Sequence, residues 1–187
     1  MIKTERIILR KASFADCDKF AIWESQKNVI ENFCTDGKRD LDRITNEFHR
    51  LTHDPTAMWL TIVLRRTGEP IGRVGLTGID PINDCVNLTN IYIGDENLRG
   101  QGLGEEATRA TLEYVFTELD MHRLISRHFL DDVRSEHLYS KLGFRTEGTL
   151  KKAGKQGKEY LDMRLRAILR DEWEEHLEVE AAEAAEQ

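Results

Sequence analysis

Three glycines alternate immediately before a long helical pattern in the stretch ENLRGQGLGEEATRATLEYVF, residues 96–116. Gly100, Gly102 and Gly104 form a turn without side chains, and the first turn of the following helix has N–H groups that lack an intrahelical acceptor. The positive end of the helix dipole lies at the same place. Such an arrangement is typical of a phosphate site, although glycines also occur in turns with a purely structural role.

Two familiar phosphate-binding patterns do not fit these glycines. The dinucleotide pattern requires a third glycine three positions after the second, where this chain has Glu105. The P-loop requires GK followed by serine or threonine after a four-residue gap, and the sequence contains no such string. Carboxylates at Glu105 and Glu106 suit the helix dipole but would repel a phosphate, so we expect both side chains to point away from the site.

The letters RGQGLG at residues 99–104 do fit the pattern R-x-x-G-x-G. This pattern resembles the acyl-coenzyme-A pyrophosphate loop of the GNAT superfamily of N-acetyltransferases. The segment DDVRSEHLYSKLGFRTEG at residues 131–148 resembles the second motif of that family. GKEYLD at residues 157–162 and RDEW at residues 170–173 resemble the branch that contains the ribosomal-protein N-terminal acetyltransferases. Together the matches cover about residues 58–176.

The resemblance implies an α/β (α+β) fold in a single domain. Its central sheet would be mixed, mostly antiparallel and splayed at its middle, with about four flanking helices. We expect the N-acetyltransferase domain to cover residues 1–177 and an acidic, frayed tail to cover residues 178–187.

Acetyl-CoA would be the co-substrate of such a domain. The resemblance implies that its pantetheine arm pairs with backbone groups around Ile91, Tyr92 and Ile93, in the opening of the sheet. The pyrophosphate would bind the glycine loop, and Arg99 would either add charge there or face solvent. The loop residues implied in binding are Arg99, Gly100, Gln101, Gly102, Leu103 and Gly104.

Transfer of an acyl group from a thioester to an amine requires a neutral amine, a stabilised oxyanion and a proton for the departing thiolate. Tyr139 matches the family tyrosine that acts as general acid beside the sulfur; a packed core tyrosine is the alternative interpretation. The backbone N–H near Tyr92 or Ile93 would stabilise the oxyanion.

The general base is not identified by the sequence. Many relatives carry a glutamate on the strand before the glycine loop, where this chain has Leu88. His128, on the strand facing the opening, is one candidate, although a histidine in a strand often only packs. Asp80 and an ordered water are the other candidates.

Two residues of the second motif are also implied in cofactor binding. Asp132 stands where the family usually has asparagine, and it can accept a hydrogen bond from the pantetheine or from the adjacent backbone. Ser135 is retained and is expected to cap the helix or to touch the cofactor. No metal site or disulfide is expected, because Cys17, Cys34 and Cys85 are scattered; we expect buried free thiols.

The elements that must position these residues follow from hydrophobic periodicity and turn signals. The predicted strands cover about residues 5–10, 58–66, 70–79, 86–94, 122–130, 144–150 and 158–169. The predicted helices cover about residues 13–23, 40–51, 102–119 and 133–142, with a last helical turn at 170–176. A capping box of Ser13 and Asp16 begins the first helix, and residues 151–158 form a turn.

Composition limits the remaining functions. A net charge of −7 disfavours nucleic-acid binding. No apolar run is long enough to span a membrane, and the N-terminal residues lack a signal-peptide pattern, so we expect a cytoplasmic protein. A second acidic group could face a cationic substrate, but a solvated helix face is the preferred interpretation. This group consists of Glu24, Glu31, Asp36, Asp40, Asp42 and Glu47.

The amine acceptor stays open among a protein N-terminus, a polyamine and an aminosugar or other small amine. Polyamine enzymes of this branch have acidic residues in the strand where this chain has Gly75 and Gly78, which weakens the polyamine alternative. A non-catalytic coenzyme-A-binding or regulatory protein is a further alternative, which the missing strand glutamate permits. The closing strands could pair across a homodimer.

Overall fold

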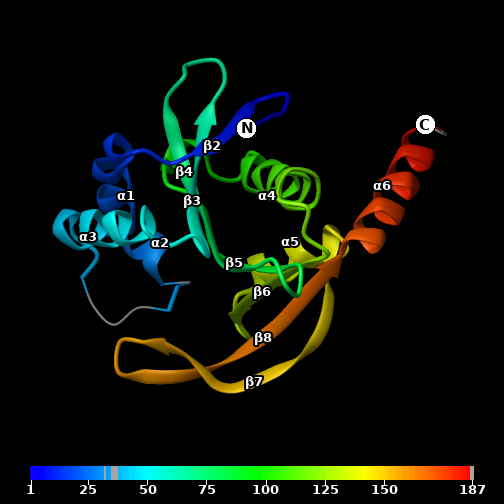
Figure 1. Ribbon diagram of the computed structural model, residues 1–187. Coiled ribbons are helices and arrows are strands. Elements are labelled where there is room, and N and C mark those ends of the chain that lie inside the picture. Colours follow the sequence, from blue (N-terminus) through cyan, green and yellow to red (C-terminus); the bar gives the residue numbers. More distant parts are fainter. Residues whose placement is uncertain (32, 35–37, 186–187) are drawn as a thin grey trace.

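The computed structural model describes residues 1–31, 33–34 and 38–185. Within these ranges the chain forms one eight-stranded sheet with helices packed on both faces (Figure 1). The strands are β1 (Ile2–Lys3), β2 (Ile7–Lys11), β3 (Ala57–Leu64), β4 (Pro70–Asp80), β5 (Cys85–Ile93), β6 (Arg123–Phe129), β7 (Arg145–Gln156) and β8 (Glu159–Leu169). The α-helices are α1 (Cys17–Glu24), α2 (Lys27–Ile30), α3 (Leu41–Leu51), α4 (Leu103–Glu113), α5 (Val133–Lys141) and α6 (Arg170–Ala185).

The strands lie in the order β1-β2-β3-β4-β5-β6-β8-β7. Every neighbouring pair is antiparallel except β5 and β6, which run parallel on either side of α4 in the sequence. The sheet is therefore mixed and mostly antiparallel, which confirms the predicted fold class.

The parallel pair separates halfway along its length. Pairing between β5 and β6 runs from Cys85 opposite Arg123 to Leu88 opposite Ser126 and goes no further. At the same point Thr89 is an extra residue in β5 relative to β4, because Leu88 and Asn90 pair with consecutive residues of β4. A bulge of this kind bends the strand that carries it. The second half of β5 thus leaves β6 and opens the splay that the sequence predicted.

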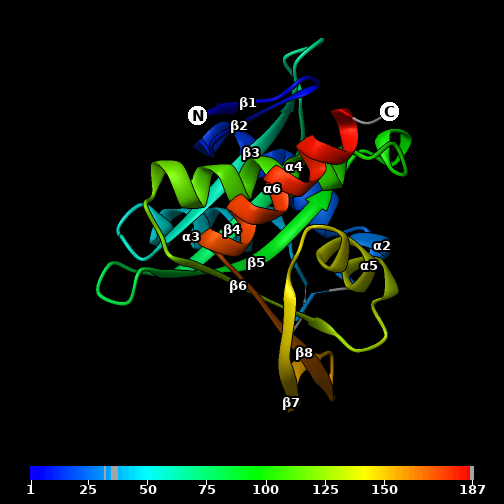
Figure 2. The same ribbon diagram turned by 90° about the vertical axis from the view of Figure 1, so that its right-hand side faces the viewer.

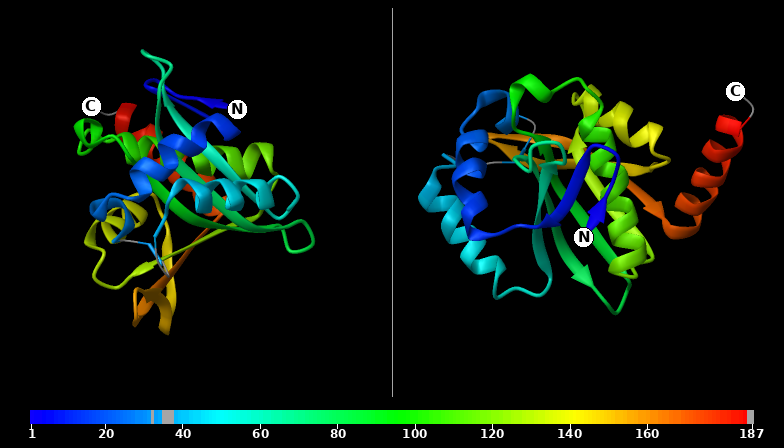
Figure 3. Two further views of the ribbon diagram at one scale, coloured as in Figure 1. Left: turned by 90° about the vertical axis from the view of Figure 1, so that its left-hand side faces the viewer. Right: turned by 90° about the horizontal axis from the view of Figure 1, so that it is seen from above.

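Alternating side chains of the strands enter two different hydrophobic cores. Leu60 and Ile62 of β3 pack in the core that contains α4, whereas Trp59 between the helices α1 and α3 belongs to the other. Figure 3 shows α1, α2 and α3 on one side of the sheet and α4 on the opposite side. In α4, apolar residues at helical spacing, such as Leu103, Ala107 and Ala110, are all buried against the sheet.

Several elements differ from the sequence-based expectation. The strands β1 and β2 are separate, and the short helix α2 was not predicted. Residues 151–156 belong to β7 rather than to a turn, and the turn itself is tight at Gly157, whose φ is 60°. The last helix, α6, runs through Ala185 instead of forming only a last helical turn at residues 170–176; Figure 2 shows it crossing beside α4.

The three cysteines are free thiols, as expected, but only Cys17 is buried; Cys34 is exposed and Cys85 is partly exposed. In the described part of the chain, no helix is both long and apolar enough to cross a membrane.

Candidate active site

The glycine loop lies between β5 and α4 and ends at Gly102, the N-cap residue of the helix. Gly100 and Gly102 have φ values of 73° and 77°, a conformation that residues with side chains rarely adopt. Gly104 lies inside the helix, and a Cβ atom added to it would meet no atom within 4 Å. The N–H of Glu106 donates to the Gly102 carbonyl at 3.0 Å, so the N–H groups before it have no acceptor within the helix. Open space in front of free donors fits a pyrophosphate group.

The two acidic residues at the start of α4 turn away from this loop, as the sequence predicted. Glu106 accepts hydrogen bonds from Thr4 Oγ1 at 2.5 Å and from Arg6 Nε at 2.6 Å. Glu105 accepts one from Lys141 Nζ at 2.7 Å. Both carboxylates are held by partners on other elements, which leaves the helix start open to an anion.

Arg99 joins the end of β5 to the loop. Its Nε donates to the Ile93 carbonyl at 3.0 Å, and its Nη2 donates to the Gly94 carbonyl at 3.0 Å and to Gln26 Oε1 at 2.9 Å. The guanidinium is therefore held beside the loop and does not face solvent freely. Gln101, by contrast, is exposed, and its side-chain amide donates to a carbonyl of the same loop at 2.8 Å.

A cavity of about 260 Å³ opens beside the glycine loop, between the far half of β5, α4 and α5. We call it the donor cavity. The sequence-predicted residues that line it are Ile91, Tyr92, Ile93, Arg99, Gly100, Leu103, Gly104, His128, Asp132, Ser135 and Tyr139. Gln101 and Gly102 are not among its lining residues. The structure thus brings together in one cavity residues from the strand, the loop and the second motif.

Tyr139 is 4% exposed and packs against the rings of His128 and Phe144, at centroid distances of 5.8 and 4.9 Å. Burial raises the pKa of Tyr139 to about 12, although the nearby Ser126 hydroxyl opposes the shift. The phenol is therefore protonated at neutral pH and available as a donor.

His128 is also buried on this side of the sheet. Its Nδ1 lies 2.9 Å from the Phe129 carbonyl, and its Nε2 lies 3.4 Å from Glu136 Oε2 on α5. The ring is thus held between its own strand and α5.

Asp132 caps helix α5. Its Oδ1 accepts from the Ser135 N–H at 3.1 Å, and its Oδ2 accepts from Ser135 Oγ at 2.7 Å. The aspartate therefore bonds the adjacent backbone, one of the two partners expected for it. Asp132, rather than Ser135, is the residue that caps the helix.

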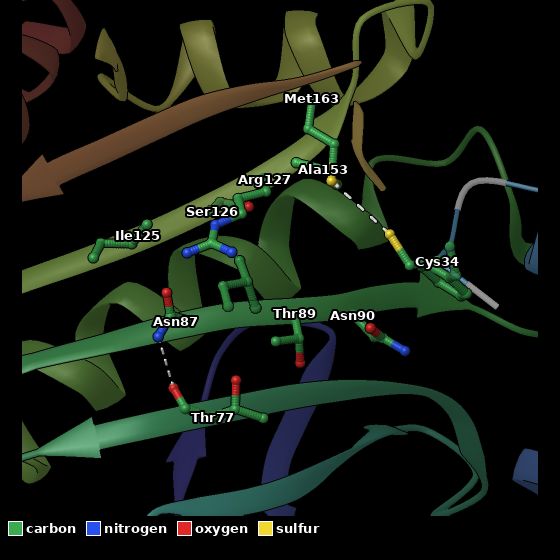
Figure 4. A pocket seen from close by; sticks show the side chains of 12 residues that line it. Cys34, Thr77, Asn87, Thr89, Asn90, Ile125, Ser126, Arg127, Ala153 and Met163 are labelled. Carbon is green, nitrogen blue, oxygen red and sulfur yellow. Dashed lines mark hydrogen bonds between the residues drawn. The ribbon is translucent and has the colours of Figure 1, made fainter. Parts of the chain in front are cut away.

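A second cavity, of about 310 Å³, lies where β5 and β6 separate, on the side of β7 and β8 (Figure 4). We call it the acceptor cavity. Its lining residues are Phe33, Cys34, Thr77, Asn87, Leu88, Thr89, Asn90, Ile125, Ser126, Arg127, Ala153 and Met163. Phe33, Thr89 and Arg127 line both cavities. A donor in one cavity and an acceptor in the other would therefore meet at the point of separation.

None of the three positions considered for the general base places a titratable side chain in the acceptor cavity. Leu88 lines the acceptor cavity and has no titratable group. His128 is not among the lining residues of that cavity, because the alternation along β6 turns it toward α5. Asp80 lines neither cavity; it accepts from the N–H groups of Ile82 at 2.9 Å and Asn83 at 3.1 Å in the β4–β5 turn. Hydrogen bonds from Asn83 lower the pKa of Asp80.

A buried group of charges beneath the site was missed by sequence reasoning. Glu24 is 1% exposed, so its predicted place on a solvated helix face is wrong. Its carboxylate lies 2.8 Å from Arg73 Nη2 and 2.8 Å from Arg39 Nη2, and it accepts from Tyr92 Oη at 2.8 Å. Asp36, of the same acidic group, lies outside the described residues. An arginine inside the apolar run PIGRVGLTGI was the available signal, because a buried charge requires a partner.

Comparison with known proteins agrees with this geometry. The family model described as an acetyltransferase (GNAT) domain matches residues 6–145. The uncharacterized N-acetyltransferase p20 of Bacillus licheniformis is 27% identical over 176 residues, which cover 91% of this chain and 96% of p20. The uncharacterized N-acetyltransferase YnaD of Bacillus subtilis is 35% identical over 82 residues. That match spans 44% of this chain and about half of YnaD, 48% of its length.

Two shorter matches come from different branches. The spermidine N(1)-acetyltransferase of Escherichia coli is 32% identical over 47% of this chain and 46% of that enzyme. The ribosomal-protein-serine acetyltransferase of Escherichia coli is 28% identical over 55% of this chain and 56% of that enzyme. These matches therefore do not distinguish the branch of the ribosomal-protein acetyltransferases from that of the spermidine acetyltransferases.

Among solved structures, a spermidine N-acetyltransferase from Vibrio cholerae in complex with CoA and spermine superposes with a TM-score of 0.83. The two chains are 20% identical over 91% of this chain and 99% of that one, a similarity that supports the fold. The glycine loop, the splayed strands and the family match agree with one another. The chain belongs to the acetyltransferase (GNAT) domain family.

Proposed function

We propose that this protein is an N-acetyltransferase that moves an acetyl group from acetyl-CoA to a primary amine by direct attack. The acceptor we propose is a small amine or a protein N-terminus. The observation that carries the proposal is the meeting of the donor and acceptor cavities at Thr89 and Arg127, where β5 leaves β6. An acyl transfer without a covalent enzyme intermediate requires both substrates at one point.

The chain's own residues would hold acetyl-CoA, which supplies the acetyl group as an activated thioester. The N–H groups at the start of α4 would bind the pyrophosphate, with space provided by Gly104. Free backbone groups around Ile91 and Ile93 would pair with the pantetheine arm, because this half of β5 has no partner in β6. The N–H near Tyr92 or Ile93 would stabilise the oxyanion.

We assign to Tyr139 the hydrogen bond to the departing sulfur. Full proton transfer from a phenol with a pKa of about 12 to a thiolate whose acid has a pKa near 8.5 would cost about 5 kcal/mol. Tyr139 would therefore donate a hydrogen bond to the sulfur that strengthens as the C–S bond breaks. The phenol would be neutral again at the end of the reaction. The amine loses one proton and the thiolate gains one, so the net reaction requires no external acid.

The general base we propose is a water in the acceptor cavity. Among the described lining residues of that cavity, none is an aspartate, a glutamate or a histidine. Leu88 has no titratable group, and Asp80 and His128 do not line this cavity. A water relay to solvent is therefore the remaining candidate base.

The main alternatives are a polyamine or aminosugar acetyltransferase and a non-catalytic coenzyme-A-binding protein. Relatives named for spermidine favour the polyamine alternative. The acceptor cavity has no carboxylate among the described residues of its lining, which disfavours this alternative, because several ammonium groups require several carboxylates. Tyr139 in the donor cavity disfavours a non-catalytic role.

Release of free thiol from acetyl-CoA, measured with a panel of amines and peptides, tests the proposal. We expect release that depends on the acceptor and an acceptor mass increased by one acetyl group. Measurable binding of CoA without acceptor-dependent release would favour the non-catalytic alternative. The branch of ribosomal-protein acetyltransferases, the domain limit at residue 177, a cytoplasmic location and a homodimer remain predictions.

A further inference from the structure

We propose that the acceptor amine carries a carboxylate close to its amino group and that Arg127 recognises this carboxylate. The inference rests on the proposed function and narrows its substrate class. Among the residues that line the acceptor cavity, Arg127 has the clearest chemical role. This role follows from its position and from the residues around it.

Arg127 stands at the vertex of the opening between β5 and β6. It follows Ser126, the last residue of β6 that pairs with β5, and it lines both the donor and the acceptor cavity. Figure 4 shows its guanidinium group lying between the two strands, above Asn87 and Thr89. No hydrogen bond or ion pair to the Arg127 side chain is found among the described residues. Its donors are therefore available to a ligand.

The charge of the acceptor cavity is opposite to that of the protein. The chain has a net charge of −7, but the one charged side chain among the described residues of this lining is the cation Arg127. The other polar residues of the lining are neutral, such as Asn87, Asn90 and Thr89. A cavity of this kind repels a polyamine and attracts an anion. A guanidinium binds a carboxylate through two parallel hydrogen bonds, which makes it selective as well as attractive.

The phosphates of acetyl-CoA are an unsuitable partner for Arg127. The glycine loop follows the far end of β5, and the five steps between consecutive residues from Leu88 to Ile93 span about 17 Å of strand. The pyrophosphate at the start of α4 would therefore lie far from the vertex, where Arg127 is placed beside the reacting groups. An acceptor whose carboxylate pairs with Arg127 while its amine reacts must have the carboxylate and the amine only a few bonds apart. A free amino acid and a peptide with an N-terminal aspartate meet this condition.

Matched acceptors test this inference with the full-length protein. The first pair is methionine and methioninamide; the second is a C-terminally amidated tripeptide that begins with aspartate and its counterpart that begins with asparagine. Spermidine is the fifth acceptor. The variants are Arg127→Gln, Arg127→Lys and the control Arg50→Gln, which changes an exposed arginine of α3 outside both cavities. Thiol release gives kcat/KM for each acceptor, and calorimetry gives the Kd of CoA.

In the wild type we expect kcat/KM to favour the carboxylate member of at least one pair by about tenfold or more, the value of a charge-assisted hydrogen bond. The pair that shows the preference identifies the source as a free amino acid or a peptide. Arg127→Gln should reduce the ratio toward one, Arg127→Lys should retain part of it, and Arg50→Gln should leave it unchanged. The Kd of CoA should stay the same in all three variants.

Equal rates within both pairs, a preference that survives Arg127→Gln, or spermidine as the best acceptor would overturn the inference while leaving the N-acetyltransferase intact. An Arg127→Gln variant that loses only CoA affinity would overturn it as well. Absence of thiol release with every acceptor would instead count against the proposed function itself.

Discussion

Tyr92 donates a hydrogen bond of 2.8 Å to the carboxylate of Glu24, and both side chains are almost completely buried. The bond joins β5, the strand that borders the donor cavity, to the end of α1 on the other face of the sheet. Arg73 shares the carboxylate at 2.8 Å, and its guanidinium lies 4.0 Å from the centroid of the Trp59 ring. The position of β5 thus depends on a buried ion pair.

Replacing Glu24 by glutamine should destabilise the fold strongly. The change leaves the guanidinium of Arg73, which is 1% exposed, without its charged partner, and breaking a buried pair in this way costs about 3–5 kcal/mol. Urea denaturation measures the loss, and Asp18→Asn on the exposed side of the same helix is the matched control. The double variant with Glu24→Gln and Arg73→Met should recover part of the stability, because both buried charges are then absent. A loss below about 1 kcal/mol in the single variant would contradict this account.

Substitutions of Gly102 and Gly104 should affect the stability of the fold and the binding of CoA in different ways. Gly102→Ala places a side chain at a φ of 77° and should cost about 1–2 kcal/mol of stability. Gly104→Ala has open space and a helical backbone, so it should raise stability by up to about 1 kcal/mol. The same Cβ would occupy the space proposed for the pyrophosphate, and the Kd of CoA should rise about tenfold as a charge-assisted bond is lost.

Denaturant curves and calorimetry with CoA measure the two effects. A Gly104→Ala variant that gains stability and keeps full CoA affinity would show that the pyrophosphate does not approach this residue.

Tyr139→Phe should lower kcat strongly and leave the Kd of CoA nearly unchanged, because the hydroxyl is needed at the sulfur as the bond breaks rather than for binding. Tyr114→Phe is the matched control: this tyrosine is also buried, but it lies in the α4 core outside both cavities. Thiol release under saturating substrates gives kcat. Near-normal turnover of Tyr139→Phe would reject the assigned role.

The pKa of Tyr139, raised to about 12 by burial, also predicts a pH dependence. A tyrosine with an ordinary pKa near 10 would ionise between about pH 9 and 11, whereas Tyr139 should stay protonated there. The tyrosinate absorbance of the wild type should therefore equal that of Tyr139→Phe up to about pH 11. An extra group titrating near pH 10 in the wild type would contradict the burial effect.

Asp16 should make folding stability depend on acid pH. Burial raises the pKa of this carboxyl, but hydrogen bonds from Arg10, Ser13 and Thr61 outweigh burial and lower the pKa to about 2. Because the folded pKa lies below the unfolded one, the stabilisation is present above about pH 4 and disappears as the pH falls toward 2. Asp16→Asn should thus lose about 2 kcal/mol at pH 7 and almost nothing relative to wild type at pH 2.

Urea denaturation at several pH values checks this expectation. A stability difference between Asp16→Asn and wild type that does not shrink between pH 5 and pH 2 would contradict it.

The turn before α4 could be predicted from the sequence because its residues are adjacent in the chain, and its role in holding the acetyl donor remains a prediction. The glycine loop and the start of α4 follow from local backbone preferences, and a contiguous motif predicts them directly. The cap of α5 was expected at Ser135 but is Asp132. The alternating pattern of the strands likewise defined most of the sheet. Short elements such as β1 and α2 offer too few residues for a periodic signal, and the length of α6 depends on distant contacts, such as that of Arg109 with Glu180 at 2.7 Å.

The sequence by itself thus determined the fold class and the glycine loop at the start of α4. Only the tertiary structure decided that Glu24 is buried with Arg73, that His128 faces α5, and that Arg127 lies at the opening. These relationships depend on strand register and on which face each strand presents, and a shift of one residue would reverse them. Local propensity does not encode such a choice, because it results from packing between segments that are far apart in the chain.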